Sequence, residues 1–348
     1  MKTLRMLGNK KSEVIDVPDP EPKDDLVVIK VMASVVCGTE RHAYFSETPI
    51  PINGGSGHEC AGIVWKTDTA ASVKEGDRVS IFSSYFGGFE NCGVCPACAA
   101  GEWLHCSSKT LNRLQMGSHT QYILIPEALC MPIADDVPFD TGAMIDDCIG
   151  TPFRAIKRLG IAGGDTVLVT GAGPIGANAA IISKFRNAQV IVADVNAYRM
   201  ALAKENGADH VFNPDNEDVL SAVRELTGGG GVDTAIECSG MAPAQALCLD
   251  AAKARGGVAF LGIKNPTVSV NMSMHFVLKE LTLIGSWACS APEHHEIVNC
   301  IQQGMPVHRI ITHRFGMDDA PEALNTFFDG KGVKVAIHPW ENTGEIHD

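Results

Sequence analysis

A glycine-rich turn near the middle of the 348-residue chain constrains the fold more than any other feature. The apolar, β-branched run 166–170 is followed at once by the pattern GxGxxG, and a helix-like stretch comes next. In this context Gly171 permits a tight turn, Gly173 lets the backbone approach a pyrophosphate, and Gly176 allows close packing of helix on strand. The predicted dinucleotide-binding turn consists of Gly171, Gly173, Pro174, Ile175 and Gly176.

Short apolar strands alternate with helical stretches around this turn, which is typical of a parallel sheet with crossover helices. The predicted strands are 166–170, 189–194, 210–213, 232–238, 258–262 and 281–286. The predicted helices include 197–206, 217–227 and 243–254. Six such strands make a complete doubly wound Rossmann sheet, which we place in residues 151–288.

Asp194 ends the second predicted strand, at the position where an acidic side chain can accept hydrogen bonds from both ribose hydroxyls. The same carboxylate would repel a 2′-phosphate. The sequence therefore predicts NAD rather than NADP as the cofactor.

The first half of the chain has a different texture, with short β signals at 26–36, 61–65 and 122–125 and a turn leading into a strand at 74–79. We expect residues 1–150 to form a mostly antiparallel, barrel-like domain. Residues 289–348 lack the strand–helix alternation and are predicted to return to this first domain. The fold class is thus α/β, with the nucleotide domain inserted into a mostly β domain.

Charge and hydropathy exclude several classes of partner. The formal net charge of −13 disfavours nucleic acid and anionic membrane surfaces, which require a basic face. The longest apolar stretch, 26–37, is interrupted by Lys30 and is too short to cross a bilayer. The N-terminus lacks the apolar core of a signal peptide, so we expect a cytoplasmic protein.

Four cysteines lie close together in the first half, in the pattern C-x-x-C-x-x-C-x7-C. Thiolates with this spacing can surround one tetrahedral Zn²⁺, and four sulfurs leave no position for a substrate, so the site would be structural. An iron–sulfur cluster or a redox pair is the alternative. These predicted ligands are Cys92, Cys95, Cys98 and Cys106.

A second set of metal-binding residue types is dispersed. Cys37 opens the phrase Cys-Gly-Thr-Glu-Arg-His, His58 and Glu59 follow about twenty residues later, and Asp147 precedes the nucleotide domain. A cysteine, a histidine and a carboxylate can make an open zinc site, in which water or substrate completes the coordination. Spacing alone does not assemble these residues into one site.

These elements, taken in order, resemble the zinc-containing medium-chain dehydrogenase/reductase family over nearly the whole chain, and more closely its polyol and threonine dehydrogenase-like branch. The resemblance implies a GroES-like catalytic domain and two zinc ions per chain. It implies Cys37, His58 and Asp147 as catalytic zinc ligands. Asp146 is adjacent to Asp147, and a count of one residue more or less would take it for the third ligand. Glu59 would either ligate the zinc or lie just behind it. Glu40 departs from the family's usual aspartate.

The resemblance also implies roles in catalysis and cofactor binding. Zinc would make the substrate hydroxyl easier to deprotonate. Thr39 would accept that proton and His42 would pass it on through the cofactor ribose. Ser239 and Trp287 would hold the nicotinamide, and Arg199 would cover the adenine. Tyr44 and the stretch 85–90 are candidates for the substrate pocket.

The function predicted from the sequence is oxidation of a secondary alcohol of a polyol, cyclitol or sugar derivative to a ketone. The alternatives are an L-threonine 3-dehydrogenase, a general secondary-alcohol dehydrogenase, and a non-catalytic protein that binds zinc and nucleotide. The expected partner is a small-molecule alcohol. By resemblance, the chain should form a homodimer or homotetramer.

Overall fold

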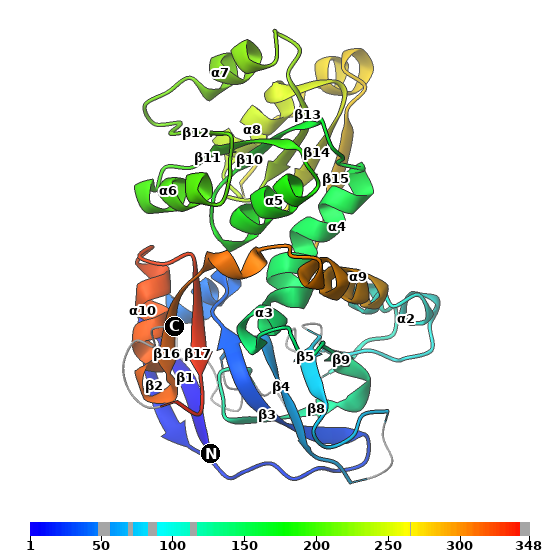
Figure 1. Ribbon diagram of the computed structural model, residues 1–348, viewed down its shortest axis with the longest axis vertical. Coiled ribbons are helices and arrows are strands. Elements are labelled where there is room, and N and C mark those ends of the chain that lie inside the picture. Colours follow the sequence, from blue (N-terminus) through cyan, green and yellow to red (C-terminus); the bar gives the residue numbers. More distant parts are fainter. Residues whose placement is uncertain (48–55, 69–71, 83–88, 112–116, 265, 342–348) are drawn as a thin grey trace. The chain divides into compact units, whose positions relative to one another are not determined.

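The computed structural model describes all residues except 48–55, 69–71, 83–88, 112–116, 265 and 342–348 (Figure 1). The chain divides into two compact units. The first comprises Met1–Asp147, Cys289–Gln303 and Ile311–Asp348. The second comprises Cys148–Ala288 and Gly304–Ile310, so the segment 304–310 groups with the second unit although the sequence analysis placed it in the first.

A seven-stranded sheet forms the centre of the first unit. Its hydrogen-bonded order is β16-β17-β3-β4-β5-β9, with β8 paired to β3, and among the described strands this order does not close into a complete barrel. All pairs are antiparallel except β16 and β17. The strands are β3 (Leu26–Val35), β4 (Cys60–Lys66), β5 (Arg78–Ile81), β8 (Tyr122–Pro126), β9 (Cys130–Pro132), β16 (Ile311–Gly316) and β17 (Lys334–His338).

The remaining elements of this unit are short. Two small sheets pair β1 (Lys2–Gly8) with β2 (Lys11–Asp16) and β6 (Phe89–Glu90) with β7 (Thr110–Leu111). The helical segments are η1 (Gly38–Glu40), α1 (Arg41–Tyr44), α2 (Pro96–Ala99), η3 (Trp103–His105), η4 (Glu127–Leu129), α3 (Phe139–Met144), α9 (Ala291–Gln302), η8 (Met317–Asp319) and α10 (Ala320–Phe328). A π-helical turn, η5 (Ile145–Ile149), crosses the unit boundary.

Helix α10 shows why this part of the chain folds as it does. Ala320, Ala323, Leu324 and Phe327 recur at helical spacing, and all four are buried against Leu4 and other apolar residues of the first unit. Helix α10 and strand β17, near the end of the chain, therefore share a hydrophobic core with strand β1 at its start.

The second unit contains a six-stranded, all-parallel sheet in the order β12-β11-β10-β13-β14-β15. The order reverses between β10 and β13, which is where doubly wound sheets bind ligands, at the carboxyl ends of the strands. The strands are β10 (Thr166–Thr170), β11 (Gln189–Ala193), β12 (His210–Phe212), β13 (Val232–Glu237), β14 (Ala252–Phe260) and β15 (Thr282–Gly285). The predicted α/β class with a Rossmann sheet is confirmed.

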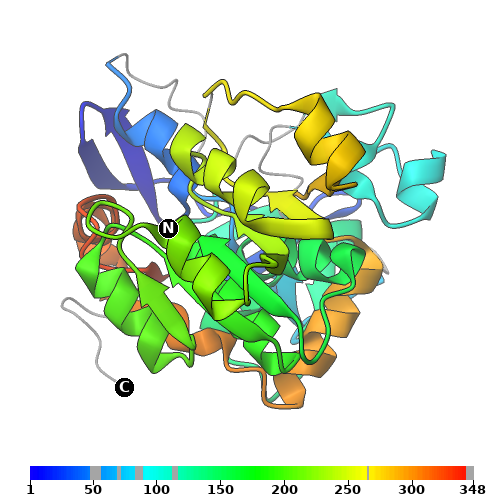
Figure 2. The same ribbon diagram turned by 90° about the horizontal axis from the view of Figure 1, so that it is seen from above.

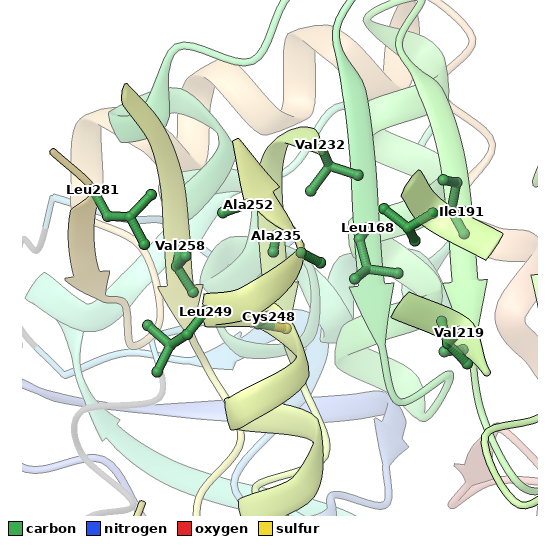
Figure 3. Packing of buried hydrophobic residues seen from close by; sticks show 13 residues of the cluster. Leu168, Ile191, Val219, Val232, Ala235, Cys248, Leu249, Ala252, Val258 and Leu281 are labelled. Carbon is green, nitrogen blue, oxygen red and sulfur yellow. The ribbon is translucent and has the colours of Figure 1, made fainter. Parts of the chain in front are cut away.

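Helices cover both faces of this sheet, as Figure 2 shows. Residues of α7 and α8 pack with Leu168, Ala235 and Val258 of the strands in one buried cluster (Figure 3). The helical segments are α4 (Gly150–Leu159), α5 (Pro174–Phe185), α6 (Ala197–Glu205), α7 (Val219–Leu226), α8 (Ala242–Ala251), η6 (Met272–Leu278) and η7 (Val307–Ile310).

One predicted boundary is wrong. The alanine-rich stretch to residue 254 favours helix by propensity, but α8 ends at Ala251 and Ala252 begins β14. Ala252 pairs with Val232. Lys279 donates from its ammonium group to the carbonyls of Leu249, Asp250 and Ala252, around the end of the helix. Tertiary contacts therefore override local propensity here.

None of the described helices has the length and apolar character needed to span a bilayer.

Candidate metal and dinucleotide sites

Four potential metal ligands from three separate segments converge in the first unit. Cys37 follows β3, His58 and Glu59 immediately precede β4, and Asp147 lies in the π-helical turn η5. Their ligand atoms all lie within 4.8 Å of one another. The three dispersed segments of the sequence thus form one cluster, which spacing alone did not predict.

The distances fit a tetrahedral ion. Cys37 Sγ lies 3.6 Å from Asp147 Oδ2, and His58 Nε2 lies 3.2 Å from the same oxygen. Ligands about 2.0–2.3 Å from one zinc ion are about 3.3–3.8 Å apart at the edges of a tetrahedron. Sulfur, imidazole nitrogen and carboxylate oxygen are a donor set typical of catalytic zinc. The residues therefore fit zinc.

Proton equilibria in the cluster are strongly perturbed. Burial lowers the pKa of His58, but Cys37 and Asp147 beside it more than compensate and raise this pKa well above its usual value. Because only neutral imidazole binds a metal, metal binding here competes with protonation of His58. Burial raises the pKa of Glu59 to about 7, although the ammonium group of Lys334 opposes the change.

The structure distinguishes Asp147 from its neighbour. Asp146 points elsewhere and is buried, with Oδ1 3.2 Å from His294 Nδ1 and Oδ2 accepting from the Ser80 hydroxyl at 3.3 Å. The Asp146 carbonyl also accepts from the backbone N–H of Cys289. The geometry thus assigns Asp147, and not Asp146, to the metal-binding group.

Thr39 lies at the edge of this group and is exposed. Its hydroxyl is 3.4 Å from both Cys37 Sγ and His58 Nε2, which places it beside any hydroxyl bound to a metal here. His42 is exposed on the next helical turn, and no hydrogen bond joins it to Thr39 among the described residues. A relay between them therefore requires the cofactor or water.

The candidate pocket residues have different outcomes. Tyr44 is not on the surface: it is 3% exposed, stacks on Phe328 and donates to Asn325, so it belongs to the core. Residues 85–88 of the other candidate stretch lie outside the described residues. Arg41 is turned toward the Phe45 ring, 4.3 Å from its centroid.

The four cysteines of the predicted structural site surround one point. Their sulfurs lie 3.9 Å (Cys92–Cys98), 3.5 Å (Cys95–Cys98) and 3.9 Å (Cys95–Cys106) apart. Four sulfurs about 2.3 Å from one zinc would be about 3.8 Å apart. Backbone hydrogen bonds from Cys98 and Ser107 lower the pKa of Cys95 to about 5, which favours the thiolate that a metal requires. The cluster fits a closed structural zinc.

The glycine-rich turn has the geometry that the motif predicts. Gly171 has φ +86°, and a Cβ there would lie 2.9 Å from Ser239. A Cβ on Gly176 would overlap the carbonyl of Gly171. A Cβ on Gly173 would meet only Arg199, at 3.8 Å, so the backbone is open to a ligand at the N-terminus of α5, where Pro174 and Ile175 follow.

Asp194, the predicted ribose-binding residue, stabilises this turn. Its Oδ2 accepts from the N–H of Ala172 at 2.5 Å and its Oδ1 from the N–H of Asn196 at 2.7 Å. Asn196 in turn caps α6, which carries Arg199. The carboxylate is therefore rigidly held at the end of β11, with the Arg199 guanidinium nearby.

The two predicted nicotinamide residues follow strands of the same sheet. Ser239 comes after β13, where a single oxygen of the buried Glu237 accepts from the Ser239 N–H, the Ser239 hydroxyl and the Gly240 N–H. Trp287 comes after β15 and is 53% exposed, next to Ala288, whose N–H donates to Thr151. Both residues lie at the carboxyl edge of the sheet.

Sequence reasoning missed two residues beside the metal ligands. Lys334 begins the largely apolar strand β17 and pairs with Glu59. An isolated cation at the start of an apolar run is a signal that could have pointed to it. His119 pairs with Glu40 at 3.1 Å in the interior, and no local motif marks it. Burial raises the pKa of Glu40, but His119, together with His58 and the Cys37 N–H, more than compensates, so that the pKa is lowered overall.

Comparisons with known proteins identify the family of this chain. A family model described as an alcohol dehydrogenase GroES-like domain matches residues 23–135, and one described as zinc-binding dehydrogenase matches residues 174–303. An L-threonine 3-dehydrogenase of Anaeromyxobacter sp. (strain K) is 35% identical over 332 residues, covering 92% of this chain and 93% of the relative.

Two solved structures show the same fold. The alcohol dehydrogenase TADH from Thermus sp. ATN1 matches with a TM-score of 0.88 at 22% identity, covering 97% of this chain and 99% of that one. A putative zinc-binding dehydrogenase from Sinorhizobium meliloti 1021, bound to NADP, matches with a TM-score of 0.84 at 28% identity, with coverage of 97% and 99%.

Proposed function

Because the chain belongs to the zinc-binding alcohol dehydrogenase family, we propose that it uses NAD to oxidise a secondary alcohol of a polyol, cyclitol or sugar derivative to a ketone. The observation that carries the proposal is the cluster of Cys37, His58, Glu59 and Asp147 with the Thr39 hydroxyl at its edge. Bound zinc supplies a Lewis acid that makes a hydroxyl easier to deprotonate.

The chain's own residues divide the remaining tasks. Cys37, His58 and Asp147 hold the metal, and Glu59 lies within reach of it while paired with Lys334. Thr39 is placed to accept the substrate's hydroxyl proton, and His42 is exposed three residues further on to release it to solvent. The turn at Gly171–Gly176 and Asp194 hold the cofactor.

Charge supports a neutral substrate. A carboxylated or phosphorylated substrate needs an Arg or Lys clamp. Of the cations nearest the cluster in the described part of the chain, Arg41 is stacked on Phe45 and Lys334 is committed to Glu59. The net charge of −13 further disfavours anionic ligands, nucleic acid and anionic membranes.

A second candidate substrate is L-threonine. It is favoured by relatives named L-threonine 3-dehydrogenase that are 33–35% identical over more than nine-tenths of this chain. Threonine is also a secondary alcohol, so the same residues would act on it. Its carboxylate would require a cation beyond the two discussed above.

The test is a panel of sorbitol, xylitol, inositols, threonine and ethanol with NAD at alkaline pH, scored by kcat/KM for NADH formation. The polyol proposal expects a polyol or cyclitol to rank first. Threonine in first place would replace it with the second candidate, and ethanol in first place would exclude both. If zinc-loaded protein oxidises no compound in the panel, the alternative of a non-catalytic protein that binds zinc and nucleotide is favoured.

Thr39 offers a matched pair of variants for the same assay. Thr39→Val removes the hydroxyl and should lower kcat by about 10²–10⁴-fold, whereas Thr39→Ser retains the hydroxyl and should retain most activity. Equal activity in the two variants would exclude Thr39 as the proton acceptor.

A further inference from the structure

A buried acid–histidine pair lies directly behind the metal ligands. Glu40 is 7% exposed, and its two oxygens have different partners. Oε1 accepts from the backbone N–H of Cys37 at 2.9 Å, and Oε2 lies 3.1 Å from Nε2 of His119. Glu40 therefore connects the backbone of one metal ligand to His119.

His119 also contacts the segment that carries the second ligand. Its backbone N–H donates to the carbonyl of Ser56 at 2.9 Å, and the N–H of Ser118 donates to the carbonyl of Gly57. A methyl group added to Gly57 would lie 2.8 Å from two carbons of the His119 ring. The ring thus packs directly against the residue that precedes His58.

The histidine is held on its remaining side by the strand that leads to Cys37. Its Nδ1 lies 2.9 Å from the hydroxyl of Ser34 in β3, and both residues are fully buried. A hydroxyl can donate or accept, so this contact is satisfied in either tautomer of the ring. With all its polar groups engaged, the ring has one defined orientation.

We propose that His119 and Glu40 are positioning residues which hold the Cys37 and His58 segments at the separation that the catalytic zinc requires. The length of Glu40 lets one side chain reach both the Cys37 N–H and His119. A side chain shorter by one C–C bond, about 1.5 Å, could still accept from the Cys37 N–H but would not reach His119. The proposal rests on the metal cluster of the proposed function and not on the substrate.

The first experiment measures zinc affinity at the catalytic site by competition with a chromophoric chelator, on the full-length protein. His119→Phe keeps the ring volume but removes both hydrogen bonds, and Glu40→Asp keeps the charge and the contact with Cys37. Each should weaken catalytic zinc binding by about 10–100-fold, as loss of partners behind metal ligands does elsewhere. His119→Gln, which can still donate toward Glu40, should recover part of the loss.

The matched control is His338→Phe. His338 is a partly buried histidine of the same unit that pairs with Asp140. Among the described residues, its polar contacts include none of the four metal ligands. It should lower thermal stability and leave catalytic zinc affinity unchanged. A cobalt-substituted protein provides a second readout, because the visible spectrum of Co²⁺ should change in His119→Phe and Glu40→Asp but not in the control.

A double variant shows whether Glu40 and His119 act as a linked pair or independently of each other. If Glu40 acts through His119, Glu40→Asp combined with His119→Phe should bind zinc as weakly as either single variant. Full additivity, or single variants with native zinc affinity and an unchanged cobalt spectrum, would overturn the proposal. Because Glu40→Asp preserves the buried charge, it remains informative if His119→Phe does not fold. Wild-type protein that binds zinc only at the cysteine cluster would instead refute the metal site itself.

Discussion

Lys334 and Glu59 form an ion pair in the interior of the first unit, with each side chain only 1% exposed. Lys334 enters from β17, near the end of the described chain, while Glu59 follows the ligand His58 directly. The pair therefore places a compensating positive charge beside a carboxylate that lies among the metal ligands.

Removal of Lys334 should destabilise the protein strongly. Lys334→Met leaves the Glu59 carboxylate buried beside Asp147 without its cation, a change that costs about 3–5 kcal/mol in comparable buried pairs. The free energy of unfolding, measured by denaturant titration of protein from which the catalytic zinc has been removed, should fall accordingly. Glu59→Gln combined with Lys334→Met should recover part of the loss, because no charge then remains unpaired. Native stability in Lys334→Met alone would contradict this account.

Metal analysis of protein purified without chelator should give close to two zinc equivalents per chain. Cys95→Ser should remove one equivalent and lower the melting temperature, because binding at a structural site is coupled to folding. Cys37→Ser should remove the other, abolish turnover and leave the fold intact. Cys300→Ser, outside both clusters, is the control and should retain both ions. A reproducible value of one or less in the wild type would refute the two-site assignment.

Asp194 should determine the preference for NAD over NADP. A 2′-phosphate beside this carboxylate would suffer repulsion between like charges. Asp194→Ala should raise the ratio of kcat/KM for NADP to that for NAD by about tenfold or more, equivalent to about 1.4 kcal/mol. It should also weaken binding of both cofactors, since the carboxylate accepts from the N–H of Ala172 in the phosphate turn. Equal efficiency of wild-type protein with both cofactors would contradict the prediction.

The pair formed by Asp140 and His338 should make stability depend on pH. Burial alone would raise the pKa of Asp140, but His338 and Arg314 lower it below 3.8, so its contribution is present above about pH 3.8 and is lost on further acidification. Burial alone would lower the pKa of His338, but Asp140 raises it above 6.5, so its contribution is complete below about pH 6.5 and is lost as the pH rises through the raised value.

His338→Gln tests this window. The difference in melting temperature between wild type and variant should be largest between about pH 4.5 and 6.5 and should shrink by pH 9, because neutral His338 no longer pairs with a charge. A difference that is constant from pH 5 to 9 would show that the pair contributes no charge interaction.

Self-association is expected at the free edge of the parallel sheet. Strand β15 ends the hydrogen-bonded order, and the segment before it exposes Phe276, Val277 and Leu278. We propose that a second copy of the chain covers this edge, giving a homodimer or a homotetramer built from dimers. Leu278→Asp should lower the mass measured by light scattering, whereas Leu226→Asp, on α7 of the same unit, should not. A monomeric wild type would refute the proposal.

The local patterns of the sequence were sufficient for the architecture of the second unit and for the chemistry of the cysteine cluster. Strand periodicity and the GxGxxG turn depend on neighbouring residues, so β10 through β13 and the helices α6 and α7 agree with the prediction to within a few residues. The start of β14 at Ala252 differs from the prediction. There the hydrogen bond from Lys279 and the strand pairing with Val232 outweigh the helix propensity of the alanines.

Long-range contacts decided the rest. Only the tertiary structure places Cys37 beside Asp147, 110 residues away, and turns Asp146 toward His294. It alone brings Lys334 to Glu59 across 275 positions and His119 to Glu40 across 79. The sequence by itself determined which residue types could bind zinc and nucleotide, since those signals lie within short segments. Which of these residues meet, and what supports them, was decided by strand pairing between distant segments, whose register depends on packing of the whole unit.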